Sequence, residues 1–124
     1  MSSLPQISES ELEVMKILWE LGEATSSQIV DRLTQSTDWK SKTIQTLITR
    51  LVLKKAIKSE KINAKAFNYY PLVSELDYKS YANKSFLQKL YNGSINLMFA
   101  SFIKEQKLSK EEIDQLKKLL DEEV

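Results

Sequence analysis

The side chains best suited to chemistry stand together on one predicted helix, residues 41–55. Apolar residues recur along it at i, i+3, i+4 and i+7, so one face is expected to be buried: Ile44, Leu47, Ile48 and Leu51. The other face carries hydroxyl, amide and cationic groups and no acid: Lys42, Thr43, Gln45, Thr46, Thr49 and Arg50. A threonine methyl group can meet thymine, and a glutamine amide can pair with adenine. We therefore expect this helix to read double-stranded DNA.

The distribution of charge supports contact with a polyanion. The chain of 124 residues has a formal net charge of only +1, but the sign of the charge changes along it. Residues 1–37 sum to −4 and residues 67–124 to −1, whereas residues 38–66 carry eight basic and two acidic side chains, net +6. Positive charge confined to one segment indicates a phosphate-facing surface on an otherwise neutral protein.

The composition excludes several other classes of protein. The sequence has no cysteine and no histidine, which removes disulfides, thiolate catalysis and the commonest ligands of transition metals. Its carboxylates stand mostly at helix starts and its serines lack a paired base, so no catalytic constellation assembles, and no cofactor or metal is expected. No apolar run approaches the roughly 18 residues of a membrane span, and the start shows no signal-peptide pattern. We expect a cytoplasmic protein that is not an enzyme.

Two short helices are expected ahead of the basic helix. Each opens with a capping box, Ser8–Glu11 and Thr25–Gln28, in which side chains bond the free backbone N–H groups of the first turn. Gly22 is expected to end the first of these helices. Trp19 and Trp39 are expected to pack in the core rather than to act in a site.

A two-stranded hairpin is expected after the basic helix. The apolar pattern changes there to two short strands, residues 56–61 and 66–72, joined by a turn at residues 62–65. Helix, helix, basic helix and hairpin is the order of a winged helix, a variant of the helix-turn-helix. Lys61 and Lys65 lie at the rim of the turn, where we expect them to contact phosphate. Protection of a strand edge against aggregation is the alternative.

The remaining residues, 74–124, are expected to form an arm of three helices behind a DNA-binding domain at residues 1–73. The arm lacks the mass for its own core yet carries many large apolar groups, which favours burial against a second copy of the chain. The residues expected at this dimer interface are Leu87, Leu90, Tyr91, Leu97, Met98, Phe99, Phe102, Ile103, Leu116 and Leu119. A ligand pocket at Phe99 and Phe102 is the alternative. The expected fold class is mainly α with a small β-hairpin: a winged helix-turn-helix followed by a three-helix dimerisation arm.

Several short stretches also carry a family pattern. They are Ile7–Met15, Trp19, Asp38-Trp39, Lys42–Leu51, Tyr69-Tyr70-Pro71, Phe86-Leu87 and Leu90–Gly93. On these residues the chain resembles the BlaI/MecI/CopY family of penicillinase-type repressors across nearly its whole length. The run that begins Lys-Thr-Ile at Lys42 is the most specific part of the resemblance.

The resemblance implies a winged helix, a dimerisation arm and repression of resistance or metal-homeostasis operons. The residues that fall where the family's recognition helix meets DNA are Lys42, Thr43, Gln45, Thr46 and Arg50. Members often have Ser-Pro where this chain has Lys40-Ser41. Penicillin-responsive members are cut by a membrane-bound metalloprotease at an Asn-Phe bond, which matches Ser101-Phe102 here. Copper-responsive members use a cysteine cluster that this chain lacks. The expected partners are operator DNA, a second copy of the chain and a sensor metalloprotease.

Two questions stay open at the level of sequence. A winged helix that binds an acidic protein instead of DNA would carry the same positive segment. The event that ends repression could be proteolysis at Ser101-Phe102, a small ligand or dilution of a weak dimer. The residues favour a homodimer on a dyad-symmetric operator, with half-sites spaced by whole turns of about ten base pairs.

Overall fold

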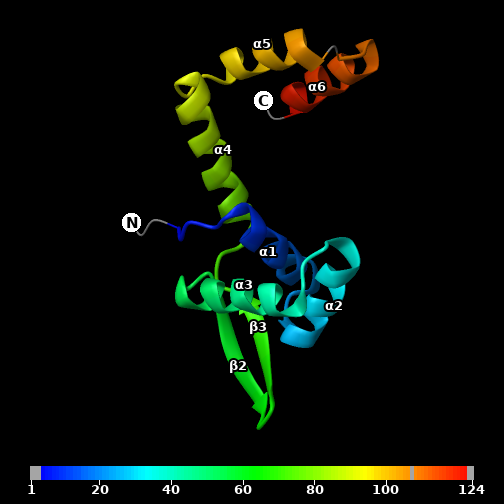
Figure 1. Ribbon diagram of the computed structural model, residues 1–124. Helices are drawn as coiled ribbons and strands as arrows, with labels where there is room; N and C mark the ends of the chain where they lie inside the picture. Colours follow the sequence, from blue (N-terminus) through cyan, green and yellow to red (C-terminus); the bar gives the residue numbers. More distant parts are fainter. Residues whose placement is uncertain (1–3, 107, 123–124) are drawn as a thin grey trace. The chain divides into compact units, whose positions relative to one another are not determined.

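The computed structural model describes residues 4–106 and 108–122, and within them the protein has six helices and one three-stranded antiparallel sheet (Figure 1). In chain order the elements are α1 (Glu9–Leu21), β1 (Ala24–Thr25), α2 (Ser26–Ser36), α3 (Ser41–Leu53), β2 (Ile57–Asn63), β3 (Ala66–Pro71), α4 (Glu75–Tyr91), α5 (Ile95–Gln106) and α6 (Lys110–Glu122). The chain forms two compact units, Met1–Tyr81 and Ala82–Val124, and α4 belongs to both. The predicted mainly helical fold with a small hairpin is confirmed.

The first two helices begin where their sequences predict. Ser8 caps α1: its Oγ accepts a hydrogen bond from the Glu11 N–H at 3.1 Å, and its own N–H donates to the Glu11 carboxylate at 2.9 Å. Thr25 and Gln28 form the same capping box at the start of α2. α1 ends at Gly22, whose φ of 85° is a left-handed conformation that glycine adopts without strain. These local bonds decide where each helix starts and stops.

The core of the first unit lies where α1, α2, α3 and the base of the hairpin meet. Met15 of α1 and Ile29 of α2 are fully buried there, and the four apolar residues predicted for the inner face of α3 are at most 5% exposed. Trp19 and Trp39 pack against this core, as expected. The Trp19 indole N–H also donates to the carbonyl of Val73 at 2.8 Å, which holds the segment leading into α4 against α1.

The hairpin β2–β3, called the wing below, differs from its prediction at the tip and at one edge. β2 runs to Asn63 instead of ending at Lys61, because an irregularity in register between them keeps the strand paired with β3. The Asn63 Oδ1 accepts from the Lys65 N–H at 2.9 Å and narrows the turn to two residues. On the other side of β3, β1 adds a third strand with Ala24 opposite Tyr69. A strand of two residues is too short to show alternation in a sequence.

The boundaries of α3 also differ from the prediction. Its N-cap residue, Lys40, makes no side-chain hydrogen bond to the helix, so α3 lacks the capping box that opens α1 and α2. The helix ends at Leu53, two residues before the predicted end at Lys55. Lys55 adopts a φ of 64°, in the left-handed region, and a residue in that conformation terminates a helix.

The described residues of the second unit form helices but enclose no buried interior of their own. Tyr78, in the part of α4 that belongs to the first unit, lies against Trp19 with ring centroids 5.6 Å apart. Further along α4, the rings of Phe86 and Tyr91 lie 5.8 Å apart. Among the residues described after Tyr81, none reaches the burial of the side chains in the first unit's core.

One carboxylate lies inside the first unit. Glu11 is 2% exposed, and its Oε1 accepts from the Lys54 Nζ at 2.5 Å while the same Nζ donates to the carbonyl of Gln6 at 2.9 Å. Burial raises the pKa of Glu11, but hydrogen bonds from Lys54 and Ser8 outweigh burial and lower that pKa below its ordinary value of 4.5. The pair therefore joins the start of α1 to the end of α3 through a charged carboxylate.

Replacing Glu11 by Gln is expected to lower the free energy of unfolding at neutral pH by about 1–2 kcal/mol, because the partly exposed Lys54 loses its charged partner. The pKa of Glu11 is lowered in the folded state. The carboxylate therefore stabilises the fold above its unfolded pKa, and this contribution is lost as the pH falls through the folded value. Denaturant titrations over a pH series should show the wild-type and variant proteins converging in acid.

Glu13→Gln is the matched control, because Glu13 lies on the same helix and pairs with Lys16 at the surface, 3.0 Å away. This substitution should change the free energy of unfolding by less than about 0.5 kcal/mol. Equal destabilisation by the two substitutions would contradict the role of the buried pair. A difference in the free energy of unfolding between Glu11→Gln and the wild type that persists in acid would also contradict it.

Candidate nucleic-acid interface

The polar side chains of α3 all lie on its solvent side, the outer face of α3. Every residue predicted to contact DNA from this helix is exposed: Lys42, Thr43, Gln45, Thr46, Thr49 and Arg50. The inner face is closed by the core, where Ile44 and Leu51 have no exposed surface. Because a helix has a single axis, burying one face decides which side chains the other face presents.

Two of the three threonines on the outer face are bonded to the helix backbone. The Thr46 hydroxyl donates to the carbonyl of Lys42 at 3.0 Å, and the Thr49 hydroxyl donates to the carbonyl of Gln45 at 3.0 Å. Each hydroxyl hydrogen is thus used inside the helix, and only the oxygen lone pairs and the methyl group remain for a partner. In this orientation the group can accept from a base amino group or contact a thymine methyl.

The cations of this surface are not neutralised by neighbouring acids. The ion pairs among the described residues are Lys16–Glu13, Arg32–Glu20, Lys54–Glu11 and Lys79–Glu75. Within residues 4–106 and 108–122, Lys42 and Arg50 take part in no ion pair, and neither does Lys61 or Lys65. Cations without paired acids produce a positive potential that attracts a polyanion.

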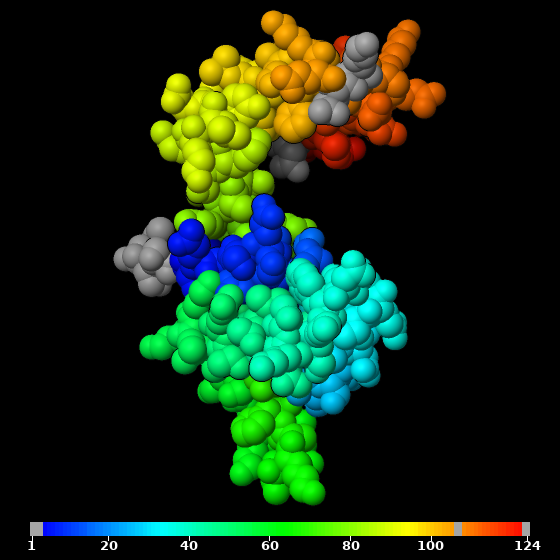
Figure 2. All heavy atoms as spheres, in the orientation of Figure 1, coloured from blue at the N-terminus to red at the C-terminus, as the bar shows by residue number. Residues whose placement is uncertain are grey.

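The wing carries two of these cations. Lys61 stands opposite Phe67 in the register of β2 and β3, so the two side chains lie on the same face of the sheet. Lys65 lies in the turn and is exposed, as is Lys61. In the space-filling view the wing projects beyond the helices of the first unit (Figure 2). Its tip can therefore reach a partner that the outer face of α3 contacts.

A groove of about 200 Å³ connects the outer face of α3 to the wing. The residues that line it are Thr49, Val52, Leu53, Ser59, Phe67 and Tyr69. Thr49 brings the polar face of α3 into the groove, and Phe67 brings the face of the wing that carries Lys61. The groove thus lies between the polar face of α3, at Thr49, and the face of the wing that carries Lys61.

Leu53 is a member of this surface that the sequence analysis missed. It follows Lys42, Thr46 and Thr49 at 11, 7 and 4 residues, which places it on the same helical face. Its side chain is 77% exposed. A leucine in line with a polar face departs from the amphipathic pattern, and this departure was the signal that could have revealed it.

Lys54 belongs to the basic segment, residues 38–66, but its charge is paired with an acid. Its Nζ is bonded to Glu11 and to the carbonyl of Gln6, so it stabilises the fold instead of facing a partner. A count of charges along the sequence cannot separate such a residue from Lys42 or Lys61. Only the contact with α1 does so.

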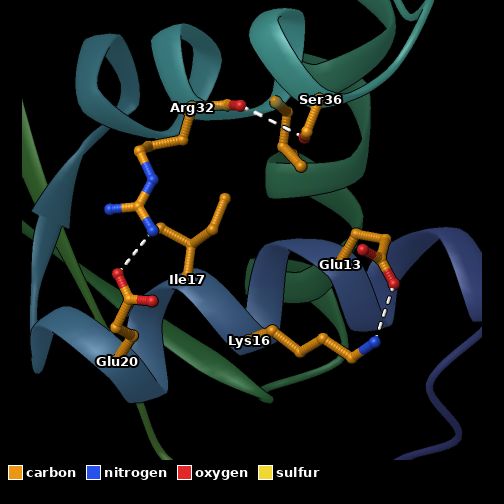
Figure 3. A pocket seen from close by; sticks show the side chains of 7 residues that line it. Glu13, Lys16, Ile17, Glu20, Arg32 and Ser36 are labelled. Carbon is orange, nitrogen blue, oxygen red and sulfur yellow. Dashed lines mark hydrogen bonds and ion pairs between the residues drawn. The ribbon is translucent and has the colours of Figure 1, made fainter.

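A second hollow lies between α1 and α2, and none of the residues that line it belongs to α3 or the wing. It has a volume of about 210 Å³ and is lined by charged and apolar side chains of α1 and α2. Figure 3 shows that its charges already pair with each other: Arg32 with Glu20, and Lys16 with Glu13 at 3.0 Å. The charges of this hollow are thus paired with each other, unlike those of the outer face of α3.

The residues predicted at the dimer interface lie on all three helices of the second unit. The most exposed of them are Leu90 (59%), Leu97 (54%), Phe102 (43%), Ile103 (50%) and Leu119 (58%). The others are half-buried: Leu87, Tyr91, Met98, Phe99 and Leu116. Large apolar side chains are thus available over the whole unit for contact with another molecule.

The matching position for the family's cleavage site lies inside a helix. Ser101 and Phe102 both belong to α5, Ser101 half-buried and Phe102 exposed. A peptide bond in an α-helix is not in the extended form, so cutting here requires local unwinding of α5.

Two features are absent from the described part of the chain. No helix in residues 4–106 or 108–122 is long and apolar enough to cross a membrane. The same residues contain no cluster of three or more acidic side chains arranged to hold a metal ion.

Comparison with known proteins gives matches over nearly the whole chain. A family model described as penicillinase repressor matches residues 7–122. The chain is 38% identical over 122 residues to the penicillinase repressor of Bacillus licheniformis, covering 98% of this chain and 94% of the relative. It is 41% identical over 115 residues to the methicillin resistance regulatory protein MecI of Mammaliicoccus sciuri, covering 93% of each.

Two solved structures match 63% of the chain. The solution structure of the DNA-binding domain of the repressor BlaI aligns with a TM-score of 0.56 at 38% identity, over 63% of this chain and 94% of that chain. A structure of monomeric BlaI from Bacillus licheniformis in complex with the blaP half-operator aligns with a TM-score of 0.55, at the same identity and coverage. The likeness confirms the winged-helix fold predicted from the order of the elements.

Proposed function

The chain belongs to the penicillinase repressor family, and from this membership we propose that it represses transcription as a homodimer on a dyad-symmetric operator. The family consists of transcriptional repressors and not of enzymes. Relatives are named penicillinase repressor and methicillin resistance regulatory protein, which supports an antibiotic-resistance operon, such as one for a β-lactamase, as the target. The proposed location is the cytoplasm, with residues 1–73 binding DNA and residues 74–124 forming the dimer.

The observation that carries DNA binding is the acid-free surface formed by the outer face of α3 and the face of the wing that carries Lys61 and Phe67. The free cations on it, among them Lys42, Arg50 and Lys61, suit phosphate. Thr46 and Thr49 present methyl groups and lone pairs that suit base edges in the major groove. We assign sequence choice to the threonines and Gln45, and positioning on the backbone to the cations.

Selection of duplexes from a random pool by the full chain should enrich a dyad-symmetric sequence. Arg50→Ala should then weaken binding to the selected duplex by about tenfold and reduce the dependence of log Kd on log salt concentration by about one, because one phosphate contact is lost. Fluorescence anisotropy over a salt series measures both quantities.

Arg32→Ala is the matched control, since Arg32 is also exposed but is paired with Glu20 between α1 and α2. It should leave the affinity and the salt dependence unchanged. If the wild-type chain selects no duplex and is not retained by DNA at moderate salt, the alternative of a winged helix that binds an acidic protein replaces this proposal.

The second unit is proposed to be the dimerisation domain. Its helices hold no side chain buried to the extent of the core among the described residues after Tyr81, and its large apolar groups need a partner surface. A second copy of the chain carries the same apolar groups and can supply that surface. Two linked DNA-binding domains bind two half-sites with an avidity that a single domain lacks. Dimerisation would therefore set the strength of repression.

Leu97→Asp should convert the dimer to a monomer at tens of micromolar, because an unpaired charge is costly to bury in an apolar interface. Leu72→Asp is the control: Leu72 is 52% exposed, close to the 54% of Leu97, but lies in the first unit. Sedimentation equilibrium distinguishes the two states. A monomeric wild-type chain, or a Leu72→Asp chain that dissociates equally, would overturn this assignment of the interface.

Relief of repression is proposed to occur by cleavage of α5 at Ser101-Phe102 by a membrane-bound sensor metalloprotease. The support is the position of this bond in the family pattern and the apolar surface around it. Cutting there would divide the proposed dimer interface. Because the bond is helical, local unwinding of α5 must come first.

Incubation with the sensor protease from the same operon should yield two fragments that mass spectrometry assigns to a cut after Ser101. Phe102→Ala should slow this cut at least about tenfold, since the family's proteases act at a bond to Phe. Phe86→Ala is the control, because Phe86 and Phe102 are both 43% exposed in the same unit. An intact chain, or a cut at another bond, rules this mechanism out.

A further inference from the structure

The groove between α3 and the wing combines apolar walls with hydroxyl groups. Leu53 stands at one rim with 77% of its side chain exposed, and Phe67 stands at the other with 45% exposed. Val52 and Tyr69 are half-buried and also pack against the core, so they hold the floor in place. The two exposed rims belong to different elements, and they face one open channel that begins at the outer face of α3.

The polar atoms of the groove favour an anionic occupant. None of its six lining residues is an acid: Thr49, Val52, Leu53, Ser59, Phe67 and Tyr69. Within the described residues, the hydroxyls of Ser59 and Tyr69 make no hydrogen bond and remain free to donate. Lys61 lies opposite Phe67 on the same face of the wing and is not paired with an acid there. The neighbouring Glu60 alternates to the opposite face of β2.

We propose that this groove holds the sugar–phosphate backbone of one DNA strand, with Leu53 and Phe67 packed against deoxyribose and the hydroxyls of Ser59 and Tyr69 donating to a phosphate. The inference rests on the DNA binding proposed above and adds a strand-positioning contact to it. A sugar–phosphate chain is the occupant that matches apolar walls, free donors and flanking cations together. It also continues directly from the base edges that the outer face of α3 would contact.

The contact of Leu53 with deoxyribose can be told from the other DNA contacts by its effect on base preference and on salt dependence. Deoxyribose is present at every nucleotide, so Leu53 contributes affinity without choosing a sequence. It carries no charge, so it releases no counterions and leaves the salt dependence of binding unchanged. A cation such as Arg50 changes the salt dependence, and a threonine such as Thr46 changes the base preference.

Leu53→Ser should raise the Kd for the duplex selected by the wild-type chain by about tenfold, because the apolar surface buried on the sugar is lost. The same factor should appear for every single-base variant of that duplex, and the salt dependence should be unaltered. Leu76→Ser is the matched control: Leu76 is 78% exposed and lies in the first unit, on α4. It should bind like the wild type.

Hydroxyl-radical footprinting of the same complexes reads the sugar directly. The wild-type chain should protect one or two deoxyriboses next to each half-site, and Leu53→Ser should expose them to cleavage while the rest of the footprint remains. Ser59→Ala gives a second, independent test, because it removes one phosphate donor with little change of volume. It should weaken binding about threefold at all sequences.

The outcomes separate this inference from the proposed function. A wild-type chain that binds no duplex overturns both. A wild-type chain that binds, with Leu53→Ser and Ser59→Ala binding equally well, overturns the groove contact alone. A loss confined to one base position also overturns it, because Leu53 would then contact a base and not the backbone.

Discussion

The burial of one face of α3 is the constraint on which the rest of the structure depends. Ile44 and Leu51 have no exposed surface, and Leu47 and Ile48 have almost none. Turning the helix about its axis would expose these side chains, and removing a single buried leucine typically costs about 2–5 kcal/mol. That is a large share of the roughly 5–15 kcal/mol that holds a small domain folded. The outward direction of every polar residue on α3 follows from this burial.

Two further contacts decide how the helix meets its neighbours. At its end, Lys54 bonds Glu11 and so ties α3 to α1. On its flank, the wing is held by Ile57, which is buried, and by Tyr69, which packs on the core and pairs across to β1. The wing therefore leaves the core in a defined direction. The basic segment divides accordingly into one cation that stabilises the fold and several that face solvent.

The two units of the chain differ in how far their apolar side chains are buried. In the first unit, three helices and a sheet enclose a core that contains fully buried side chains such as Met15 and Ile29. In the second, α5 and α6 start at well-formed caps, Ser94 and Ser109, whose hydroxyls each accept a backbone N–H. Local capping makes these helices, but it does not bury their apolar residues. Their exposed apolar surface is what separates the second unit from the first.

Contacts between residues three or four apart were predictable, because helix geometry alone brings such residues together. The capping boxes at Ser8 and Thr25 and the two faces of α3 are of this kind. Other features depend on how distant segments pack. The bond between Lys54 and Glu11 spans 43 positions, β1 is a strand only because β3 lies beside it, and the groove exists only where α3 crosses the wing. The periodicity of a short stretch of sequence cannot predict contacts between distant segments, because these contacts form only when whole elements pack around one core. The exposed polar residues of α3 could thus be read from the chain, whereas the place of Leu53 beside the wing required the fold.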